Sequence, residues 1–578
     1  MKKGAIALSV GLLLGMLTNQ AEAAKTVTGK VFWDRNENGI QETWERGISD
    51  VCVSNGKEVT QTDKKGNYEL PAYDDMVVFV VKPSGWMTPV DENNLPQFSY
   101  IHKPAGSPDE IQRFRGIEPT GLLPNMVNFP LYRAGKEFFF KAIITGDTQV
   151  YNDREINFLR DSLVKEVQGT KASFCISMGD NVGDDLNLYP RYLEVMSKMG
   201  IPVYYVPGNH DLDFDATRDE DSFDTMKSYM GASYYSFNYG EVHFVILDSV
   251  EYPHETSGSY NGQISDIQME WLANDLAYVP KDKLIVLNMH IPIVSDLDRA
   301  SEKHQVDNRE QLYALLDGRK VVSLGGHTHT LSHFKAGDEL DGWGQETPFD
   351  QIIVGAACGS WWSGDLDDTG VPVSYMRDGA PRGHMVFSFR GNRYKDIYKA
   401  GAKAYNKQIH LAFLTDDFRS WYADRAAGGD VTIADLENRN IISSDQLSTA
   451  KLIANVWGAN KDDKVVFIFD NQTTVLGEYS EDVMDPYALP LEMYVLRGVP
   501  GFALFDKNWD DGTFTGAQYG PGQAVDLGEW LHTTAGRSTH LFQCSVPTDL
   551  EAGAHSVEVV TRNSYGKVFR EKLVFEVD

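Results

Sequence analysis

The sequence predicts an α/β core, layered as an α+β sandwich, flanked by two β-rich, sandwich-like domains. Short strand patterns separated by turns fill residues 25–135, strand and helix patterns alternate over 136–390, and strand-like runs return over 391–578. A chain of 578 residues is also long enough for several domains of ordinary size. We therefore expect three folded domains, with a leader of residues 1–23 in front of them.

The first folded region is expected to be a small β-sandwich. Its strand patterns lie at 26–33, 50–53, 68–70 and 77–82, and a last one at 127–131 follows an excursion rich in Pro, Asn and Gly. Several short strands at this spacing, with turn signals between them, are typical of such a sandwich.

The central region alternates in the way that is typical of layered α/β domains. Its expected strands are 138–145, 172–178, 203–206, 234–238, 242–248, 284–289 and 320–324, and its expected helices are 153–167, 189–199, 263–276 and 308–316. In such domains ligands collect outside the carboxyl ends of the strands. The last region is expected to be β-rich, with strands at 410–414, 465–469, 502–505, 540–544, 556–561 and 567–577.

Residues 1–23 have the layout of a secretory signal. Lys2 and Lys3 precede an apolar run over 5–17, and Ala21-Glu22-Ala23 forms a small-residue exit. The alternative is a single membrane anchor, but the run is shorter than a comfortable span. We therefore expect an exported protein, periplasmic or extracellular, whose mature chain has no transmembrane segment.

The formal net charge of -30 argues against binding to a nucleic-acid backbone, which needs a basic face. It does not exclude a phosphate substrate, because bound metal ions can reverse the sign of the charge locally. The four cysteines, at positions 52, 175, 358 and 544, have no short spacing of the kind that indicates a disulfide framework or a thiolate metal site.

Seven potential metal ligands occur in five short blocks, each at the end of a strand pattern. They are Asp147, Gln149, Asp180, Asn209, His290, His327 and His329. Asp147 and Gln149 are two residues apart, so in an extended segment both side chains face the same side. Oxygen and imidazole donors without a thiolate suit Mn, Fe or Zn. Two such ions, side by side, are suited to an attack on phosphorus.

The blocks resemble those of the calcineurin-like metallophosphoesterases, whose pattern runs D-x-H, G-D, G-N-H-D/E, H and G-H-x-H. The resemblance implies one ion held by Asp147, Gln149 and His329, a second held by Asn209, His290 and His327, and Asp180 bridging the two. Gln149 departs from the pattern, because His is usual there. It keeps an oxygen donor, so the departure bears on metal identity and affinity.

The resemblance extends beyond the core. The turn at 63–68 and the segment 555–566 are similar to parts of a bacterial, exported, three-domain type with N-terminal and C-terminal β domains.

In the expected reaction, a hydroxide held between the two ions attacks phosphorus in line with the leaving alkoxide. His210 is the natural proton donor to the leaving oxygen, with Asp211 as the residue expected to orient its ring.

Residues 34–45 fit a calcium-binding loop. Oxygen donors stand at loop positions 1, 3, 5, 9 and 12, and a glycine stands at position 6. These donors are Asp34, Asn36, Asn38, Glu42 and Glu45. A hydrophilic turn between two strands explains the same residues equally well. A calcium ion bound here would be structural.

Five residues after the last ligand block are candidates for contact with the substrate. They are Trp361, Trp362, Tyr375, Arg377 and Arg382. The tryptophans are placed to wall a pocket, and an arginine can bind a second phosphate or a carboxylate. The alternative is an ordinary surface loop with aromatic packing.

Together these patterns predict an exported, metal-dependent hydrolase of phosphate esters, acting on a small molecule or on a phosphorylated glycan or lipid. Cleavage of a phosphodiester rather than a monoester is left open. An alternative of a different class is a non-catalytic surface-binding protein built on an inactive scaffold. The complete ligand set and His210 argue against that alternative, because an inactive scaffold has no need of them.

Overall fold

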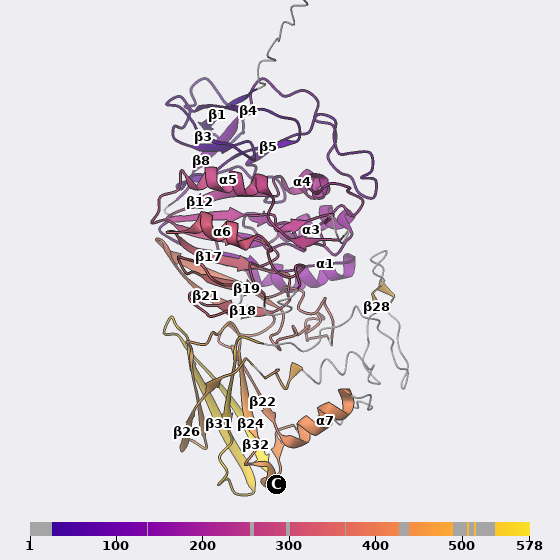
Figure 1. Cartoon of the computed structure of the whole chain (residues 1–578), viewed down its shortest axis with the longest axis vertical. Coiled ribbons are helices and arrows are strands. Elements are labelled where there is room, and N and C mark those ends of the chain that lie inside the picture. The colour runs from indigo at the N-terminus through magenta and orange to yellow at the C-terminus, as the bar shows by residue number, and fades with distance from the viewer. Residues whose placement is uncertain are drawn as a thin grey trace, which may run out of the picture.

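The computed structural model describes residues 26–135, 137–254, 259–295, 301–340, 342–364, 366–426, 439–481, 483–488, 506–507, 514–515 and 538–578. The leader predicted over 1–23 and the strand predicted at 502–505 lie outside these residues. Figure 1 shows the N-terminal sheets, the mixed core and the C-terminal sheets in succession along the long axis. The predicted fold class is confirmed. No helix in the described part of the chain is long and apolar enough to span a membrane.

The N-terminal region forms two four-stranded sheets. One has the order β4-β1-β8-β6 and the other β3-β2-β5-β7. Their strands are β1 (Thr26–Trp33), β2 (Cys52–Ser54), β3 (Val59–Gln61), β4 (Asn67–Pro71), β5 (Met76–Val80), β6 (Trp86–Met87), β7 (Ser99–His102) and β8 (Phe129–Arg133). In β4 burial alternates along the strand, because Tyr68 and Leu70 face the core and their neighbours face solvent. The sequence patterns missed β3, β6 and β7, which are too short to show a period.

The core contains two mixed sheets, of order β11-β10-β9-β20-β21 and β12-β13-β16-β17-β19-β18. The first is built from β9 (Phe139–Thr145), β10 (Phe174–Ser177), β11 (Val203–Tyr205), β20 (Gly383–Arg390) and β21 (Arg393–Ala400). The second is built from β12 (Tyr235–Tyr239), β13 (Val242–Ile246), β16 (Leu284–Asn288), β17 (Lys320–Gly325), β18 (Leu331–Phe334) and β19 (Asp350–Val354). A small pair, β14 (Val250–Glu251) and β15 (Asn261–Gly262), stands beside them.

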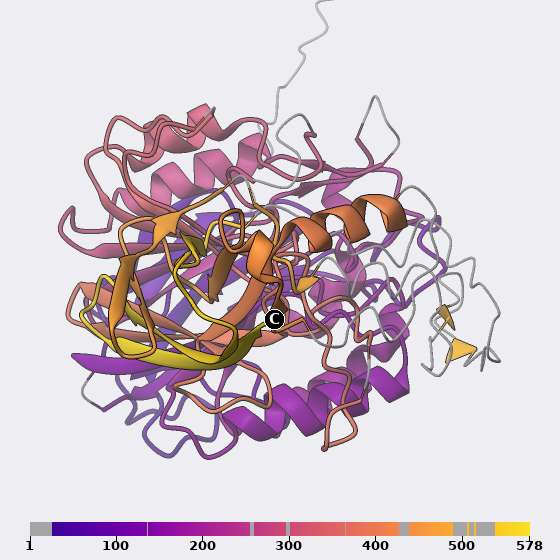
Figure 2. The same ribbon diagram turned by 90° about the horizontal axis from the view of Figure 1, so that it is seen from below.

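Helices cover the two outer faces of these sheets. They are α1 (Asp153–Leu159), α2 (Lys165–Val167), α3 (Tyr189–Ser197), α4 (Asp224–Met230), α5 (Asp266–Leu276) and α6 (Arg309–Leu316). Seen from below, the helices α5 and α6 lie on one side of the strands and α1 on the opposite side (Figure 2). The helix predicted over 153–167 is interrupted by the π-helical turn η1 (Arg160–Val164), so its i to i+4 pattern is broken in the middle.

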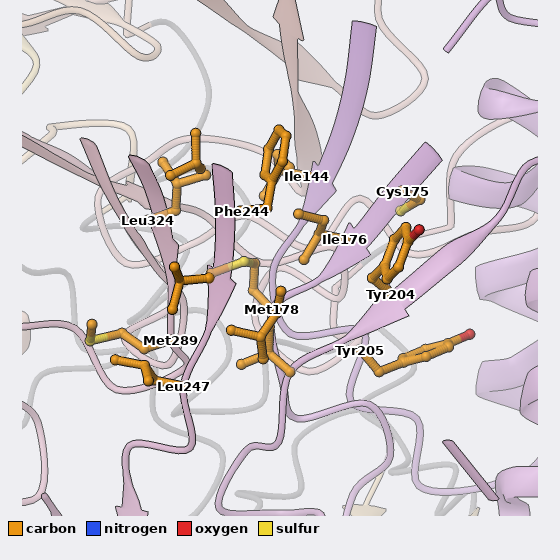
Figure 3. Close-up of a cluster of buried hydrophobic side chains, with 14 of the residues drawn as sticks. Ile144, Cys175, Ile176, Met178, Tyr204, Tyr205, Phe244, Leu247, Met289 and Leu324 are labelled. Carbon is orange, nitrogen blue, oxygen red and sulfur yellow. The ribbon is translucent and has the colours of Figure 1, made fainter. Parts of the chain in front are cut away.

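An apolar layer fills the space between the two core sheets. Figure 3 shows Ile144 and Ile176, from β9 and β10, meeting Phe244 and Leu324, from β13 and β17. All four side chains are fully buried. Burial of this size is the main force that holds the two sheets together, and it places the ends of both sheets at one edge.

The C-terminal region forms sheets of order β22-β24-β30-β27 and β23-β32-β31-β25-β26. Their strands are β22 (Ile409–Leu414), β23 (Ile441–Ile442), β24 (Lys451–Val456), β25 (Lys464–Phe469), β26 (Thr473–Leu476), β27 (Glu478–Tyr479), β30 (Leu541–Ser545), β31 (Gly553–Arg562) and β32 (Val568–Val577). The helix α7 (Asp416–Ala426) and the pair β28 (Asp506–Lys507) and β29 (Phe514–Thr515) also belong to this region.

One predicted boundary is wrong. The division after residue 390 falls inside the hairpin of β20 and β21, where Arg390 pairs with Arg393. Because β20 also pairs with β9, both strands belong to the core sheet, which therefore reaches Ala400. The sequence places no break there, since an antiparallel hairpin carries the same alternating pattern in either domain.

Candidate metal centre

Three of the predicted ligand blocks follow neighbouring parallel strands of the first core sheet. Ser177 of β10 lies opposite Thr145 of β9 and Tyr205 of β11, so the three strands end at one level. Asp147, Asp180 and Asn209 follow within four residues of these ends. All three side chains are buried.

The other two blocks follow parallel strands of the second sheet. Asn288 of β16 lies opposite Leu324 of β17. His290 comes two residues after the end of β16, and His327 and His329 follow the end of β17. The structure therefore brings ligand blocks from both sheets to the same edge.

His290 lies at the centre of one group of donors. Its Nε2 is 3.1 Å from Oδ2 of Asp180, 3.1 Å from Oδ1 of Asn209 and 3.2 Å from Nδ1 of His327. Within the described residues, Asp180, His290 and His327 are the one group of three or more His, Cys, Asp or Glu side chains whose donor atoms all lie within 4.8 Å of one another. Such donors suit a divalent transition metal.

Asp147 and His329 form a second group beside the first. Nε2 of His329 is 3.5 Å from Oδ1 of Asp147. The backbone N–H of His327 donates to both carboxylate oxygens of Asp147, and the N–H of Gln149 donates to the carbonyl of Asp180. These bonds tie the two groups to each other.

Two of the histidines are held by backbone carbonyls. Nδ1 of His290 is 2.8 Å from the carbonyl of Met178, and Nδ1 of His329 is 2.6 Å from the carbonyl of Gly359. A carbonyl only accepts, so in each ring Nδ1 carries a proton, and Nε2 is the nitrogen that faces the other donors. This arrangement is the usual one for histidines that bind a metal.

The backbone of the site is strained. Five of the seven predicted ligands have positive φ, namely Asp147 (26°), Gln149 (35°), Asp180 (49°), His327 (73°) and His329 (50°). Residues other than glycine adopt this region at a cost, and such residues cluster at functional sites. Gly179, at φ 91°, also has no room for a side chain, since a Cβ there would come within 2.7 Å of the ring of His290.

Gln149, the unusual donor, is oriented by a tyrosine. Its Nε2 donates to the hydroxyl of Tyr151, 3.2 Å away, which turns the amide oxygen away from Tyr151. Sγ of Cys358 lies 3.9 Å from that oxygen and 3.8 Å from Nδ1 of His329. Sequence reasoning missed both Tyr151 and Cys358. The spacing of two between Gln149 and Tyr151 is the only signal that could have indicated the first.

The orienting partner of His210 is not the one predicted. Nδ1 of His210 is 2.8 Å from Oδ1 of Asp184, and the two rings of His210 and Tyr151 meet edge to face. Burial lowers the pKa of His210, but the charges of Asp184 and Asp180 outweigh this and raise it to about 10. His210 is therefore protonated at neutral pH in this environment.

Asp211 holds the turn together instead of orienting His210. It is fully buried and accepts hydrogen bonds from the N–H groups of Gly208 and Asn181 and from the hydroxyl of Tyr189. Burial raises the pKa of Asp211 to about 6. The prediction that Asp211 orients the ring of His210 is wrong, because Asp211 binds Gly208, Asn181 and Tyr189 while Asp184 faces the ring.

The buried titratable groups of the site shift one another's pKa values. Burial opposes the ionisation of Asp180, but the nearby His290 and His210 hold its pKa well below the usual value. Burial together with His290 lowers the pKa of His327 well below 6.5, which keeps that ring neutral. A neutral imidazole and an ionised carboxylate are the forms in which these side chains bind metals.

Family models match along most of the chain. The model described as calcineurin-like phosphoesterase matches residues 140–331, and those of the N-terminal and C-terminal parts of calcineurin-like phosphoesterases match 35–117 and 352–494. The chain belongs to the calcineurin-like phosphoesterases.

Two curated relatives resemble part of this calcineurin-like chain. A probable glycerophosphodiester phosphodiesterase of Arcobacter nitrofigilis is 25% identical over 28% of this chain and 58% of its own. A 3',5'-cyclic adenosine monophosphate phosphodiesterase of Escherichia coli K12 is 24% identical over 27% of this chain and 53% of its own. The chain thus spans about half the length of these relatives.

The solved structures that can be superposed on part of this chain include a purple acid phosphatase of Lupinus luteus and a PhoD protein. The first has a TM-score of 0.35 at 12% identity and covers 65% of this chain and 71% of its own. The second has a TM-score of 0.34 at 10% identity and covers 65% of this chain and 85% of its own.

The predicted substrate residues have different positions in this phosphoesterase. The ring of Trp361, which is half-buried, lies 4.7 Å from the ring of His329. Trp362 is buried, and its Nε1–H donates to the carbonyl of Thr148. Trp361 therefore borders His329, whereas Trp362 is hydrogen-bonded to the backbone between Asp147 and Gln149.

The two arginines and the tyrosine have surroundings of their own. Arg382 is buried, donates to the carbonyl of Pro372 and pairs with Asp367 at 3.0 Å. Its predicted contact with a phosphate is wrong, because its guanidinium is committed to these partners. Tyr375 packs edge to face against Tyr487 of the C-terminal region, and Arg377, half-buried, follows two residues later.

The predicted calcium loop folds around its own acidic side chains. Asp34, which is fully buried, accepts from the N–H groups of Asn38 and Gly39. The amide groups of Asn36 and Asn38 both donate to Oε1 of Glu42. Oε2 of Glu42 is buried without a hydrogen-bond partner among the described residues. The loop thus has a preformed turn and one unsatisfied carboxylate oxygen, which leaves both earlier interpretations in place.

Proposed function

We propose that this protein hydrolyses phosphate esters with the help of two divalent metal ions held by the seven predicted ligands. The observation that carries the proposal is the group of Asp180, His290 and His327, whose donor atoms face one another within 4.8 Å. The backbone carbonyls that hold Nδ1 of His290 and His329 support it, because they leave Nε2 of each ring for a metal.

The donor set fits two ions. Asp147, Gln149 and His329 would hold one, Asn209, His290 and His327 would hold the other, and Asp180 would serve both, as the resemblance to the family implies. Oxygen and nitrogen donors of this kind favour Mn, Fe or Zn. When bound, two such ions supply positive charge for the phosphoryl oxygens and lower the pKa of the attacking water.

The chain's own residues handle the leaving group. His210 follows Asn209 in the sequence and has Nδ1 held by Asp184, so Nε2 is the ring nitrogen left to give a proton to the leaving oxygen. The backbone N–H of His210 donates to Oδ1 of Asp180 at 2.8 Å, which keeps the ring next to the donors. Trp361 borders His329 and is half-buried, so it is a candidate for contact with the substrate.

A phosphodiester is the substrate class that the partial relatives favour, since both of them are named as phosphodiesterases. A monoester is the second candidate, and a phosphorylated glycan or lipid fits either class.

We also propose that the protein is exported, because residues 1–23 have a charged start, an apolar run and a small-residue exit.

Metal analysis of the purified protein, combined with a screen of phosphate monoesters and diesters, tests the proposed function. We expect two transition-metal ions per chain and hydrolysis that manganese stimulates. In the variant Asp180→Asn, metal content and activity should fall together. A protein that binds no transition metal and hydrolyses no ester would instead support the non-catalytic, surface-binding alternative.

A further inference from the structure

Three histidine rings lie in a row at one side of the metal centre. Nδ1 of His327 is 3.2 Å from Nε2 of His290, and Nε2 of His327 is 3.0 Å from Nδ1 of His304. The rings of His304 and His327 have centroids 5.1 Å apart. His304 is not among the ligands that the sequence predicted, and it lies outside the group of donors within 4.8 Å of one another.

The chemistry of imidazole assigns a role to each nitrogen in this row. If Nδ1 of His327 presents its lone pair to a metal, the single proton of the neutral ring must be on Nε2. Nδ1 of His304 then has to accept that proton's hydrogen bond, because it is the nitrogen that faces Nε2 of His327. The two nitrogens of a ring point away from each other, so His304 lies on the far side of His327 from the donors.

We propose that His304 is a positioning residue, which sets the tautomer and the orientation of His327 and thereby the affinity for the second metal ion. This inference rests on the proposed function. It distinguishes His327 from the other two histidines, whose outer nitrogens face the backbone carbonyls of Met178 and Gly359. Met178 directly follows β10 and Gly359 lies in the turn after β19, whereas His304 reaches His327 with a side chain from a separate loop. The second ion is therefore the one whose affinity depends on that loop.

The backbone fixes this loop next to the strand pair of β14 and β15. The N–H of Gly262 donates to the carbonyl of Glu302, and the N–H of Asp307 donates to the carbonyl of Gly262, each at 2.7 Å. A Cβ at Gly262 would come within 2.2 Å of the carbonyl oxygen of Gln305. Gly262→Ala should therefore push residues 302–305 away and move His304 without changing any metal ligand.

Titration of the metal-free full chain with Mn²⁺, followed by calorimetry and by the electron paramagnetic resonance signal of a coupled Mn pair, tests the inference. In His304→Leu we expect the first ion to bind as in the wild type and the second about 10–100-fold more weakly, with the coupled signal reduced. His304→Asn keeps an acceptor near the position of Nδ1 and should restore the second affinity to within about threefold of the wild type. Gly262→Ala should weaken the second ion in the same direction as His304→Leu.

The outcomes separate this inference from the proposed function. If His304→Leu binds the second Mn²⁺ as tightly as the wild type, or if His304→Asn binds it as weakly as His304→Leu, the positioning role is overturned while the phosphoesterase proposal stands. If the wild type binds no second ion and hydrolyses no ester, both are overturned. Melting temperatures of the three variants report whether each is folded.

Discussion

Nδ1 of His210 lies 2.8 Å from Oδ1 of Asp184, a residue 26 positions earlier in the chain. Asp184→Asn should keep the metal but lower kcat on an alkyl phosphate by about 10²-fold, because the proton donor loses the carboxylate that orients it and keeps it charged. An aryl ester with a good leaving group should be affected much less, since it needs little protonation. Rates on both esters, compared with Asp185→Asn as a neighbouring control, check this. Equal losses on the two esters would contradict it.

Asp180 is the carboxylate whose loss should cost the metal itself. Asp180→Asn removes the charge that lies 3.1 Å from Nε2 of His290, so we expect fewer than two metal ions per chain and a loss of activity of more than about 10²-fold. Asp367→Asn is a matched control, because Asp367 pairs with Arg382 away from the donors. Metal content by mass spectrometry distinguishes the two. A full metal complement in Asp180→Asn would argue against its place in the centre.

The neighbouring tryptophans should respond differently to substitution. Trp362→Phe removes the hydrogen bond from Nε1–H to the carbonyl of Thr148 and should lower the free energy of unfolding by about 1–3 kcal/mol. Trp361→Ala should leave the melting temperature nearly unchanged and alter KM, since Trp361 borders His329 and is half-buried. Denaturant unfolding and steady-state kinetics of both variants check this. An unchanged KM for every ester in Trp361→Ala would remove it from the substrate site.

A buried lysine, Lys103, forms ion pairs that join the N-terminal sheets to the core. Nζ of Lys103 lies 2.6 Å from Asp221 and 2.8 Å from Asp224. Lys103→Met should lower the free energy of unfolding by about 3 kcal/mol, because it leaves buried carboxylates with fewer partners. Lys57→Met is the control, since Lys57 and Glu270 are an exposed pair between the same two regions and should contribute less than about 1 kcal/mol.

The same cluster predicts a dependence on pH. Burial opposes the ionisation of Asp224, but Lys227 and Lys103 hold its pKa below the usual value near 4. A depressed carboxylate pKa contributes stability that is present above the unfolded-state value and is lost as the pH falls below it. The wild type should therefore lose stability below about pH 4 more steeply than Lys103→Met. Parallel curves for the two proteins would show that Asp224 is not the group responsible.

Calcium should stabilise the N-terminal sheets if the loop at 34–45 binds it. The unsatisfied Oε2 of Glu42 would then gain a cation partner, and the melting temperature should rise with calcium concentration. Glu42→Gln should reduce that rise and leave the protein stable without calcium, since Glu42 is not part of the apolar core. An identical melting temperature with and without calcium would favour the hydrophilic-turn interpretation.

The sequence alone predicted the order and the identity of the donors of the candidate metal centre. Asp147, Asp180 and His290 each follow an apolar run, and parallel strands that pack in one domain end at a common edge. Strand position and side-chain chemistry are local properties, so they can be predicted without coordinates. The sheet to which the hairpin of β20 and β21 belongs could not be predicted in this way, because an antiparallel hairpin has the same sequence pattern in either sheet.

Only the tertiary structure decided which side chains surround and orient those donors. Asp184 rather than Asp211 faces His210, Trp361 rather than Trp362 borders His329, and Arg382 is committed to Asp367. His304 reaches His327 from a loop that no ligand pattern indicates. Each of these contacts joins segments far apart in the chain, or depends on which of two adjacent residues turns inward. Which residue turns toward the site depends on how whole layers pack and on the strained turns between them. No short stretch of sequence contains that information.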